Sequence, residues 1–312
     1  MTHVIAACMR DEALFLVEWL AHHFAVGFDR ISVFTNDCAD GTDKMLRLIA
    51  EHAPVDWYDN PGPYDEAGTI QKTALAKAFA LPHIKAATWV MHIDADEYLN
   101  VTCGDRSVSA LTNGFSKADV IGVQWRHFGK SGIDRWSGGS ILDRFTMAEA
   151  VPATPESGRL VNFKSIFRPG AFLRMDVHTP KFPALGRLPI ALNTEGQPLP
   201  IDSIMKERGS GYAAEAAQCT WENACLHHHH VKSDDLHQLK HARGDANGRN
   251  NRKRRIGSGF YRQVNLNEVE DTSIAHYRTA RLAWEERFRA IPGLAALEDA
   301  AMSSFRATYQ KD

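Results

Sequence analysis

The stretch Trp89-Val90-Met91-His92-Ile93-Asp94-Ala95-Asp96-Glu97-Tyr98-Leu99 joins an apolar run to a group of acids. Such a run is typical of a buried central strand, because both faces of that strand pack against helices. The acids follow at its C-terminal end, which is the edge where open α/β sheets bind ligands. Two carboxylates spaced i and i+2 can share one divalent cation, and an isolated pair of this kind can equally cap a helix or solvate a loop.

The segment before this stretch alternates between apolar strands and helices. Arg10 and Asp11 follow the first strand. A polar turn after the second strand contains Asn36, Asp37 and Asp40. The alternation predicts helices packed on a parallel sheet with right-handed crossovers, so these polar groups should share one edge with the acids of the central strand. The predicted strands are 3–8, 31–35, 55–58 and 89–93, and the predicted helices are 13–24, 43–52 and 66–81.

The pattern changes after residue 100 to short β-type runs separated by glycine-rich turns. We expect these runs to extend the sheet with mixed or antiparallel strands that build the acceptor side of a cleft. A segment rich in proline and glycine, residues 183–211, is interpreted as a long loop or a lid. Helical segments follow to the C-terminus, and Pro292 breaks the last of them. The β-type runs are 120–125, 141–145 and 163–169.

The composition is that of a globular chain without a strong overall charge. The 312 residues are 44% hydrophobic, which supplies a substantial core, and the net charge is −2. We therefore expect no nucleic-acid partner and interpret the basic run 252–255 as a solvated helix end. Five cysteines without a C-x-x-C pair suit a reducing compartment. Since no apolar run reaches about eighteen residues, we expect a cytoplasmic protein, either free or peripheral at the inner face of a membrane.

Three polar motifs occur in order within the first third of the chain. They are Arg10-Asp11-Glu12, Asn36-Asp37-Cys38-Ala39-Asp40-Gly41-Thr42 and Asp94-Ala95-Asp96-Glu97-Tyr98. Later elements are Lys164-Ser165-Ile166-Phe167-Arg168-Pro169, His178, His229-His230-Val231-Lys232-Ser233, Lys240 and Arg243-Gly244. Taken together, these elements resemble those of the glycosyltransferase family 2-like proteins.

The resemblance implies an α/β protein with a GT-A (Rossmann-like) fold, in which a mixed sheet is flanked by helices. We expect residues 1–232 to form this glycosyltransferase domain and residues 233–312 to form a mainly helical C-terminal extension packed on it. The resemblance also implies a metal-dependent transfer of a sugar from a nucleotide-diphosphate donor, expected to be UDP-linked, with inversion. The expected acceptor is a surface polysaccharide, another glycan or a lipid-linked glycan.

Two other functions fit the same sequence. A sugar-phosphate nucleotidyltransferase shares the sheet architecture and the metal, although no glycine-rich phosphate loop follows the first strand. A non-catalytic nucleotide- or glycan-binding protein could keep the fold, because fold alone does not determine activity.

The resemblance implies a Mn²⁺ or Mg²⁺ ion that neutralises the departing diphosphate. Asp96 is the expected direct ligand, while Asp94 is expected to contact the ion, its bound water or the ribose. His178 and His230 are the candidate histidine ligands, and either could instead be a structural residue. If His227–His230 forms a strand, alternate imidazoles face opposite sides, so at most two of them can point into the cleft.

The nucleotide is expected to bind along the strand ends. Asp37 and Asp40 can accept hydrogen bonds from uracil or ribose, and the alternative is an Asx turn around Gly41. Lys164 is a candidate for steering phosphates. The nucleotide-binding candidates in full are Arg10, Asp11, Asn36, Asp37, Asp40, Gln71, Asp94, Lys232 and Ser233.

An inverting transfer needs a carboxylate that takes the proton of the acceptor hydroxyl as it attacks. Asp134, in the loop 132–136, and Glu97, in the acidic stretch, are the two candidates for this general base.

Overall fold

The computed structural model describes residues 1–62, 69–151, 162–207, 218–244 and 255–310. Three sequence-based predictions fall partly outside these ranges. The start of the predicted helix 66–81 and the end of the segment 183–211 lie outside the described residues. The same is true of the basic run 252–255, except for its last residue.

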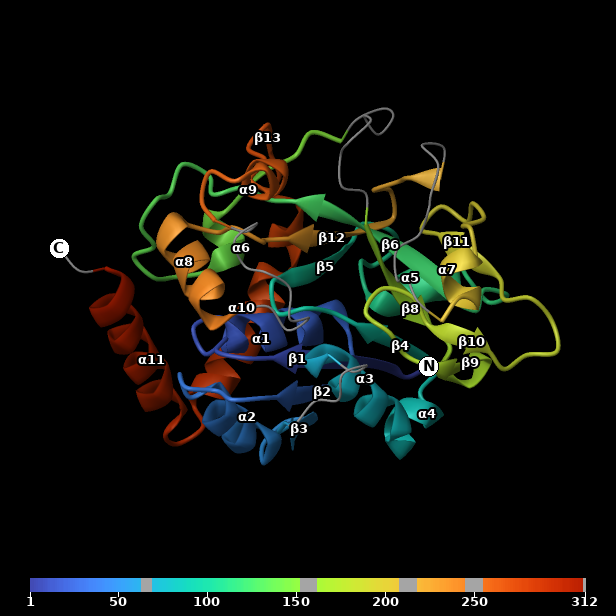
Figure 1. The fold of residues 1–312 in the computed structure, drawn as a ribbon, viewed down its shortest axis with the longest axis horizontal. Coiled ribbons are helices and arrows are strands. Elements are labelled where there is room, and N and C mark those ends of the chain that lie inside the picture. Colours follow the sequence, from blue (N-terminus) through green and yellow to red (C-terminus); the bar gives the residue numbers. More distant parts are fainter. Residues whose placement is uncertain (63–68, 152–161, 208–217, 245–254, 311–312) are drawn as a thin grey trace.

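The first half of the chain forms parallel strands joined by helices, as the alternating pattern predicts. In the sheet these strands lie in the order β3-β2-β1-β4, and every neighbouring pair is parallel. Figure 1 shows the strands in blue and teal with α2 and α3 against them. The elements are β1 (His3–Met9), α1 (Leu16–Val26), β2 (Arg30–Thr35), α2 (Thr42–Ala50), β3 (Val55–Asp59), α3 (Ile70–Ala80), α4 (Pro82–Ala86) and β4 (Trp89–His92).

The second half extends this sheet with mixed strands, which confirms the predicted change of pattern. Strand β8 is antiparallel to both β4 and β6, whereas β12 is parallel to β6 and antiparallel to β5. The order along the sheet continues β4-β8-β6-β12-β5, with β11 pairing parallel to β6. These elements are β5 (Glu97–Val101), α5 (Val108–Asn113), β6 (Val120–His127), β8 (Phe163–Phe167), β11 (Ala191–Asn193) and β12 (Ala224–His228).

Two short ribbons lie beside the main sheet. One pairs β9 with β10, and the other pairs β7 with β13 from near the C-terminus. Their bounds are β7 (Met147–Ala148), β9 (Phe172–Arg174), β10 (Lys181–Pro183) and β13 (Val269–Glu270).

The predicted strand 141–145 is wrong, because Ile141–Arg144 forms a helix, α6. The Ser140 side chain caps this helix by accepting a hydrogen bond from the Asp143 N–H. The Glu18 carboxylate of α1 accepts the Ile141 N–H at 2.8 Å and the Leu142 N–H at 3.3 Å. An acid more than a hundred residues away in sequence therefore stabilises the first turn of α6.

The segment 183–211 is not a single long loop in its described part. It contains β11 and the short helix α7 (Asp202–Met205), and the Lys181 ammonium donates to the Ser203 carbonyl. The described part of the segment therefore joins the main sheet through β6 and the β9–β10 ribbon through α7.

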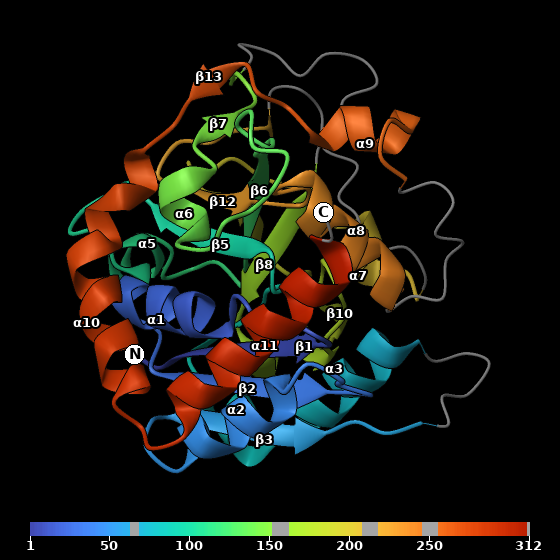
Figure 2. The same cartoon turned by 90° about the vertical axis from the view of Figure 1, so that its left-hand side faces the viewer.

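The C-terminal helices pack on helices from earlier in the chain. Figure 2 shows α10 beside α1 and α11 near α2 and α8, and each of these pairs is in contact. The Phe24 and Trp284 rings stack with centroids 4.6 Å apart between α1 and α10. Pro292 separates α10 from α11, as expected. The bounds are α8 (Asp234–Arg243), α9 (Gly259–Val264), α10 (Arg278–Arg289) and α11 (Leu294–Tyr309).

None of the helices within the described ranges has the length and hydropathy that a membrane-spanning segment requires.

Candidate active site

The acidic turn after β4 is held by its own backbone and by one tryptophan. The Asp94 N–H donates to Glu97 Oε2 at 2.8 Å, and the Glu97 N–H donates to the Asp94 carbonyl at 3.1 Å. The Trp19 indole donates to the carbonyls of both residues, at 3.1 and 3.0 Å. This turn sends the carboxylates of Asp94 and Asp96 into two different surroundings.

Asp94 faces a buried lysine. The Lys164 ammonium from β8 lies 2.8 Å from Asp94 Oδ2, and Gln71 Nε2 donates to Asp94 Oδ1 at 2.7 Å. His92 Nε2 is 3.2 Å from the same Oδ1. Although burial favours the protonated acid, Lys164 holds the pKa of Asp94 well below its usual range. The Lys164 side chain is 0% exposed and its ammonium is paired with Asp94. It therefore has no exposed surface with which to bind a phosphate.

Glu97 is buried on the same side of the turn. Its side chain is 0% exposed, and its carboxylate lies 3.6 Å from the Lys164 ammonium. Burial raises the pKa of Glu97 above its usual range. The contacts of Glu97 fix the turn and reach no surface where an acceptor hydroxyl could approach.

Asp96 faces two histidines and a lysine. His228 Nε2 lies 3.3 Å from Asp96 Oδ2, and His230 Nδ1 lies 3.8 Å from it. The Lys240 ammonium from α8 bonds to the same oxygen. Burial favours the protonated acid, yet Lys240 and His228 hold the pKa of Asp96 well below its usual range. One buried carboxylate oxygen thus has three polar side chains directed at it.

The ligand atoms of Asp96, His228 and His230 fit a divalent cation. Within the described part of the chain, one atom from each of these buried side chains lies within 4.8 Å of the other two. Burial lowers the pKa of His228, which favours the neutral imidazole that a metal ligand requires. Two imidazole nitrogens beside one carboxylate oxygen suit a divalent transition-metal ion better than Mg²⁺, which prefers oxygen ligands alone.

The two predicted histidine ligands occupy different places. His230 lies in the group around Asp96, together with His228, which the sequence did not single out. His178 lies apart from that group, since its Nδ1 bonds to the Phe163 carbonyl at 2.9 Å and its ring packs on Trp125. Burial lowers the pKa of His178 to about 3.

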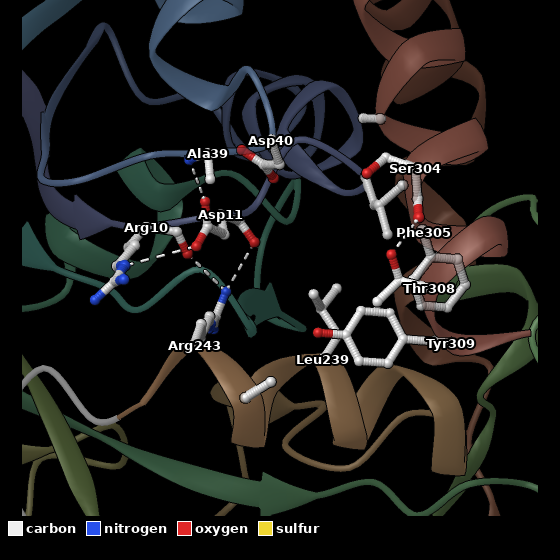
Figure 3. A pocket seen from close by; sticks show the side chains of 13 residues that line it. Arg10, Asp11, Ala39, Asp40, Leu239, Arg243, Ser304, Phe305, Thr308 and Tyr309 are labelled. Carbon is white, nitrogen blue, oxygen red and sulfur yellow. Dashed lines mark hydrogen bonds and ion pairs between the residues drawn. The ribbon is translucent and has the colours of Figure 1, made fainter.

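A pocket of about 320 Å³ lies between the ends of the first two strands and the C-terminal helices. Figure 3 shows Arg10, Asp11 and Asp40 on one side of it and the α11 residues Ser304, Thr308 and Tyr309 on the other. Arg243 of α8 donates to the carbonyls of Arg10 and Asp11 at 2.8 and 3.0 Å. Its guanidinium also lies 2.5 Å from the Glu12 carboxylate. Helix α8 therefore joins the strand ends to the C-terminal helices.

The predicted nucleotide-binding acids Asp11 and Asp40 bond to the loops at the first two strand ends. Asp40 Oδ1 accepts from the N–H and hydroxyl of Thr42, which is an Asx turn, and Oδ2 accepts from the Ala13 N–H at 2.8 Å. Asp11 Oδ1 accepts from the Ala39 N–H at 2.7 Å. These bonds tie the first strand end to the second and shape the pocket's wall.

The other nucleotide-binding candidates at the second strand end bond to each other. Asn36 Nδ2 donates to Asp37 Oδ2 at 3.0 Å. Asp37 is exposed and has a φ of 47°, a left-handed conformation that asparagine and aspartate tolerate.

The remaining candidates lie around the start of α8. The buried Lys232 ammonium lies 4.7 Å from the centre of the Phe15 ring, and burial lowers the pKa of Lys232 to about 8. The Ser233 hydroxyl donates to Asp235. Asp134 is 75% exposed and pairs with Lys130, which also binds Asp234 at 2.8 Å.

Family comparisons match the N-terminal part of the chain. The family model for glycosyltransferase family 92 matches residues 5–186. A family 92 protein of Oryza sativa subsp. japonica is 25% identical over 175 residues, which are 54% of this chain and 27% of that protein. One of Ricinus communis is 23% identical over 156 residues, which are 49% of this chain and 27% of that protein. The matched region thus spans about a quarter of the length of these curated relatives.

Solved structures show more distant similarity. S. aureus TarS, residues 1–349, is 13% identical with a TM-score of 0.30, covering 55% of this chain and 48% of that one. HddC from Yersinia pseudotuberculosis is 16% identical with a TM-score of 0.30, covering 54% of this chain and 75% of that one.

The family model covers more than half of the chain, and it corrects the finer part of the resemblance, which pointed to family 2. The chain belongs to glycosyltransferase family 92.

Proposed function

We propose that the chain is a metal-dependent glycosyltransferase that moves a sugar from a nucleotide-diphosphate donor to a glycan, surface-polysaccharide or lipid-linked glycan acceptor. The observation that carries this proposal is the cation-binding group of Asp96, His228 and His230 beside the pocket at the strand ends. Membership of family 92 supports sugar transfer as the reaction class. The proposed donor is UDP-linked.

Helix α8 connects the proposed cation site to the pocket. Lys240 reaches Asp96, while Leu239, Ala242 and Arg243 of the same helix line the pocket. Lys240 directly follows Leu239 and precedes Arg243 by three residues, so this one stretch of α8 reaches both places. A nucleoside in the pocket would therefore direct its diphosphate toward Asp96.

The chain's own residues hold and orient the reacting groups. When bound, the metal ion neutralises the charge that develops on the departing diphosphate. Asp96, His228 and His230 would hold it, and their donor set favours Mn²⁺ over Mg²⁺. The Lys164 ammonium keeps Asp94 ionised at the edge of this group. Asp134 remains the proposed general base for inversion, because its carboxylate is exposed and Glu97 is enclosed.

The expected surroundings of the protein are also part of the proposal. We propose a cytoplasmic enzyme, either free or peripheral at a membrane, with no nucleic-acid partner. The division into residues 1–232 and 233–312 is proposed as well, with the second part contributing α8 and α11 to the pocket.

Calorimetry with UDP tests the site. UDP should bind the full chain in the presence of Mn²⁺ and much more weakly without it. Asp96→Asn should weaken this Mn²⁺-dependent binding by about 100-fold or more, because it removes a charged ligand. The control is Asp299→Asn, which changes an exposed acid on α11 and should bind UDP as the wild type does. UDP binding that needs no metal and survives Asp96→Asn would overturn the assignment.

A donor panel tests the reaction. Incubation with individual UDP-sugars should release UDP slowly by hydrolysis and faster when a suitable glycan acceptor is added. Formation of inorganic diphosphate from UTP and a sugar 1-phosphate would instead identify a nucleotidyltransferase. Binding without turnover for every donor and acceptor would identify a binding protein.

A further inference from the structure

The Lys240 ammonium lies among the atoms that form the proposed cation site. It bonds to Asp96 Oδ2, and it lies 3.1 Å from His230 Nδ1 and 3.4 Å from the His230 carbonyl. The same Asp96 oxygen faces His228 Nε2 at 3.3 Å. Lys240 therefore contacts two of the three residues that could bind a divalent ion.

A lysine ammonium and a metal ion cannot use these atoms together. The lone pair of His230 Nδ1 can accept one hydrogen bond or coordinate one ion, but not both. The ammonium would also lie within a few ångströms of a doubly charged ion, in a site where burial strengthens repulsion. Binding of the ion thus requires the Lys240 side chain to leave.

The surroundings of Lys240 allow this movement. Its side chain is 17% exposed and extends from α8 next to the pocket, so the flexible four-carbon stem can swing toward solvent. Lys164 provides the contrast at the other acid of the turn. It is 0% exposed and pairs with both Asp94 and the fully buried Glu97, so it cannot leave without depriving a buried acid of its cation.

We propose that Lys240 is an internal competitor of the divalent cation, which occupies the Asp96 and His230 ligand atoms until the ion displaces it. This inference rests on the proposed metal-dependent function. Lys240 thereby couples cation binding to the release of a positive charge beside the nucleotide pocket.

Calorimetric titration of the full chain with Mn²⁺ alone, at constant pH, tests the competition. Lys240→Met should bind Mn²⁺ at least about tenfold more tightly than the wild type, since a charge-assisted hydrogen bond no longer has to be broken. The matched control is Lys232→Met. Lys232 also acts electrostatically on Asp96, but its ammonium lies over the Phe15 ring. A general charge effect would tighten binding equally in both variants and would overturn the proposal.

A measurement on the wild-type protein avoids the question of whether the variants fold. A small succinimidyl ester acylates lysines that are free of ion pairs, and mass spectrometry of peptides locates the modification. Adding Mn²⁺ should increase acylation of Lys240 several-fold and leave that of Lys164 unchanged. Unchanged acylation of Lys240 by a protein that binds Mn²⁺ would overturn this inference alone. A protein that binds no Mn²⁺ in either experiment would contradict the proposed metal dependence and this inference with it.

Discussion

Two buried carboxylates of this protein, Glu18 and Asp96, have the same chemistry and different partners. Glu18 accepts from the backbone of α6 and from the Ser140 hydroxyl, and Arg281 Nη1 lies 2.8 Å from it. Asp96 is contacted by two imidazoles and the Lys240 ammonium. Backbone N–H and guanidinium groups can only donate, whereas imidazoles offer lone pairs. The partners of Glu18 therefore suit a carboxylate that holds helices together. The imidazoles beside Asp96 suit a carboxylate that binds a cation together with them.

The pKa values of Glu18 and Asp96 are shifted in opposite directions, in line with their different partners. Burial raises the pKa of Glu18, even though Arg281 opposes the shift. The pKa of Asp96 is instead held well below its usual range. A buried carboxylate alone is thus a poor indicator of a functional site, and the lone pairs around it are more informative.

Arg281→Met should have the largest effect on stability. Arg281 is buried between Glu18, Asp143 and Glu285, so its removal leaves uncompensated acids inside the fold. We expect the free energy of unfolding to fall by about 3–5 kcal/mol, measured by urea denaturation. Mn²⁺ affinity of the folded protein should stay unchanged.

Arg278→Met is the control, because Arg278 pairs with Asp143 at a site that is 60% exposed on the arginine side. It should cost about 1 kcal/mol or less. If both variants lost the same unfolding free energy, the buried ion pairs of Arg281 would contribute no more to stability than the surface pair of Arg278.

His228→Gln should weaken Mn²⁺ binding, measured by calorimetry, by at least about tenfold. The reason is that His228 Nε2 is one of the atoms that converge on Asp96 Oδ2. His227→Gln is the matched change on the opposite face of β12, where His227 packs on Phe128. His227→Gln should bind Mn²⁺ about as tightly as the wild type does. If His227→Gln weakened Mn²⁺ binding as much as His228→Gln does, His228 would not be assigned as a ligand.

Acid should destabilise the fold through the buried histidines of α1. Burial lowers the pKa of His23 to about 3 and that of His22 well below its ordinary value. The unfolded chain takes up protons below its ordinary histidine pKa of about 6.5, while the folded chain does not. The stabilisation by neutral His23 is thus complete above about pH 6.5 and is lost as the pH falls toward 3, at about 1.4 kcal/mol per pH unit, and the stabilisation by neutral His22 is lost in the same direction.

Urea denaturation of His23→Leu between pH 6 and pH 4 measures this contribution. The fall of unfolding free energy with decreasing pH should be shallower than in the wild type by about 1.4 kcal/mol per pH unit. Identical slopes would show that His23 titrates normally in the folded protein.

Asp40→Asn should have the smallest effect. It removes an acceptor from the Ala13 N–H, and we expect a loss of about 1 kcal/mol of unfolding free energy. UDP affinity in the presence of Mn²⁺ should change less than threefold, because both Asp40 oxygens already accept hydrogen bonds from the N–H groups of Ala13 and Thr42. A larger loss of UDP affinity would assign Asp40 to direct nucleotide contact.

The sequence predicted those parts of the fold that depend on local pattern. The alternation of strands and helices in the first hundred residues is confirmed by the parallel order β3-β2-β1-β4. The predicted strand 141–145 is wrong because Glu18, distant in sequence, provides the acceptor that starts α6. Local pattern carries no information about such a partner.

The sequence predicted some residues of the candidate site and not others. Asp96 and His230 were named from motif position, and the structure brings them together. In a strand, alternate side chains face opposite sides, so the sequence allowed either His227 with His229 or His228 with His230 to face the cleft. The fold shows that His228 lies with His230. The pairing of Asp94 with Lys164 depends on β8 lying antiparallel to β4, and the contribution of α11 depends on how the C-terminal helices pack.

The separation of Asp96 from its partners along the chain bears on how the protein folds. Lys240 follows Asp96 by 144 residues, and β12, which carries His228, lies between β6 and β5 in the sheet. During synthesis, the ribosome therefore releases the acidic turn long before any group that neutralises it. Such non-local contacts form slowly, because the intervening chain must first be ordered. We expect the N-terminal strands to wait in a partly folded state, with β5 lacking the sheet partner that β12 later provides, until residues 224–240 have emerged.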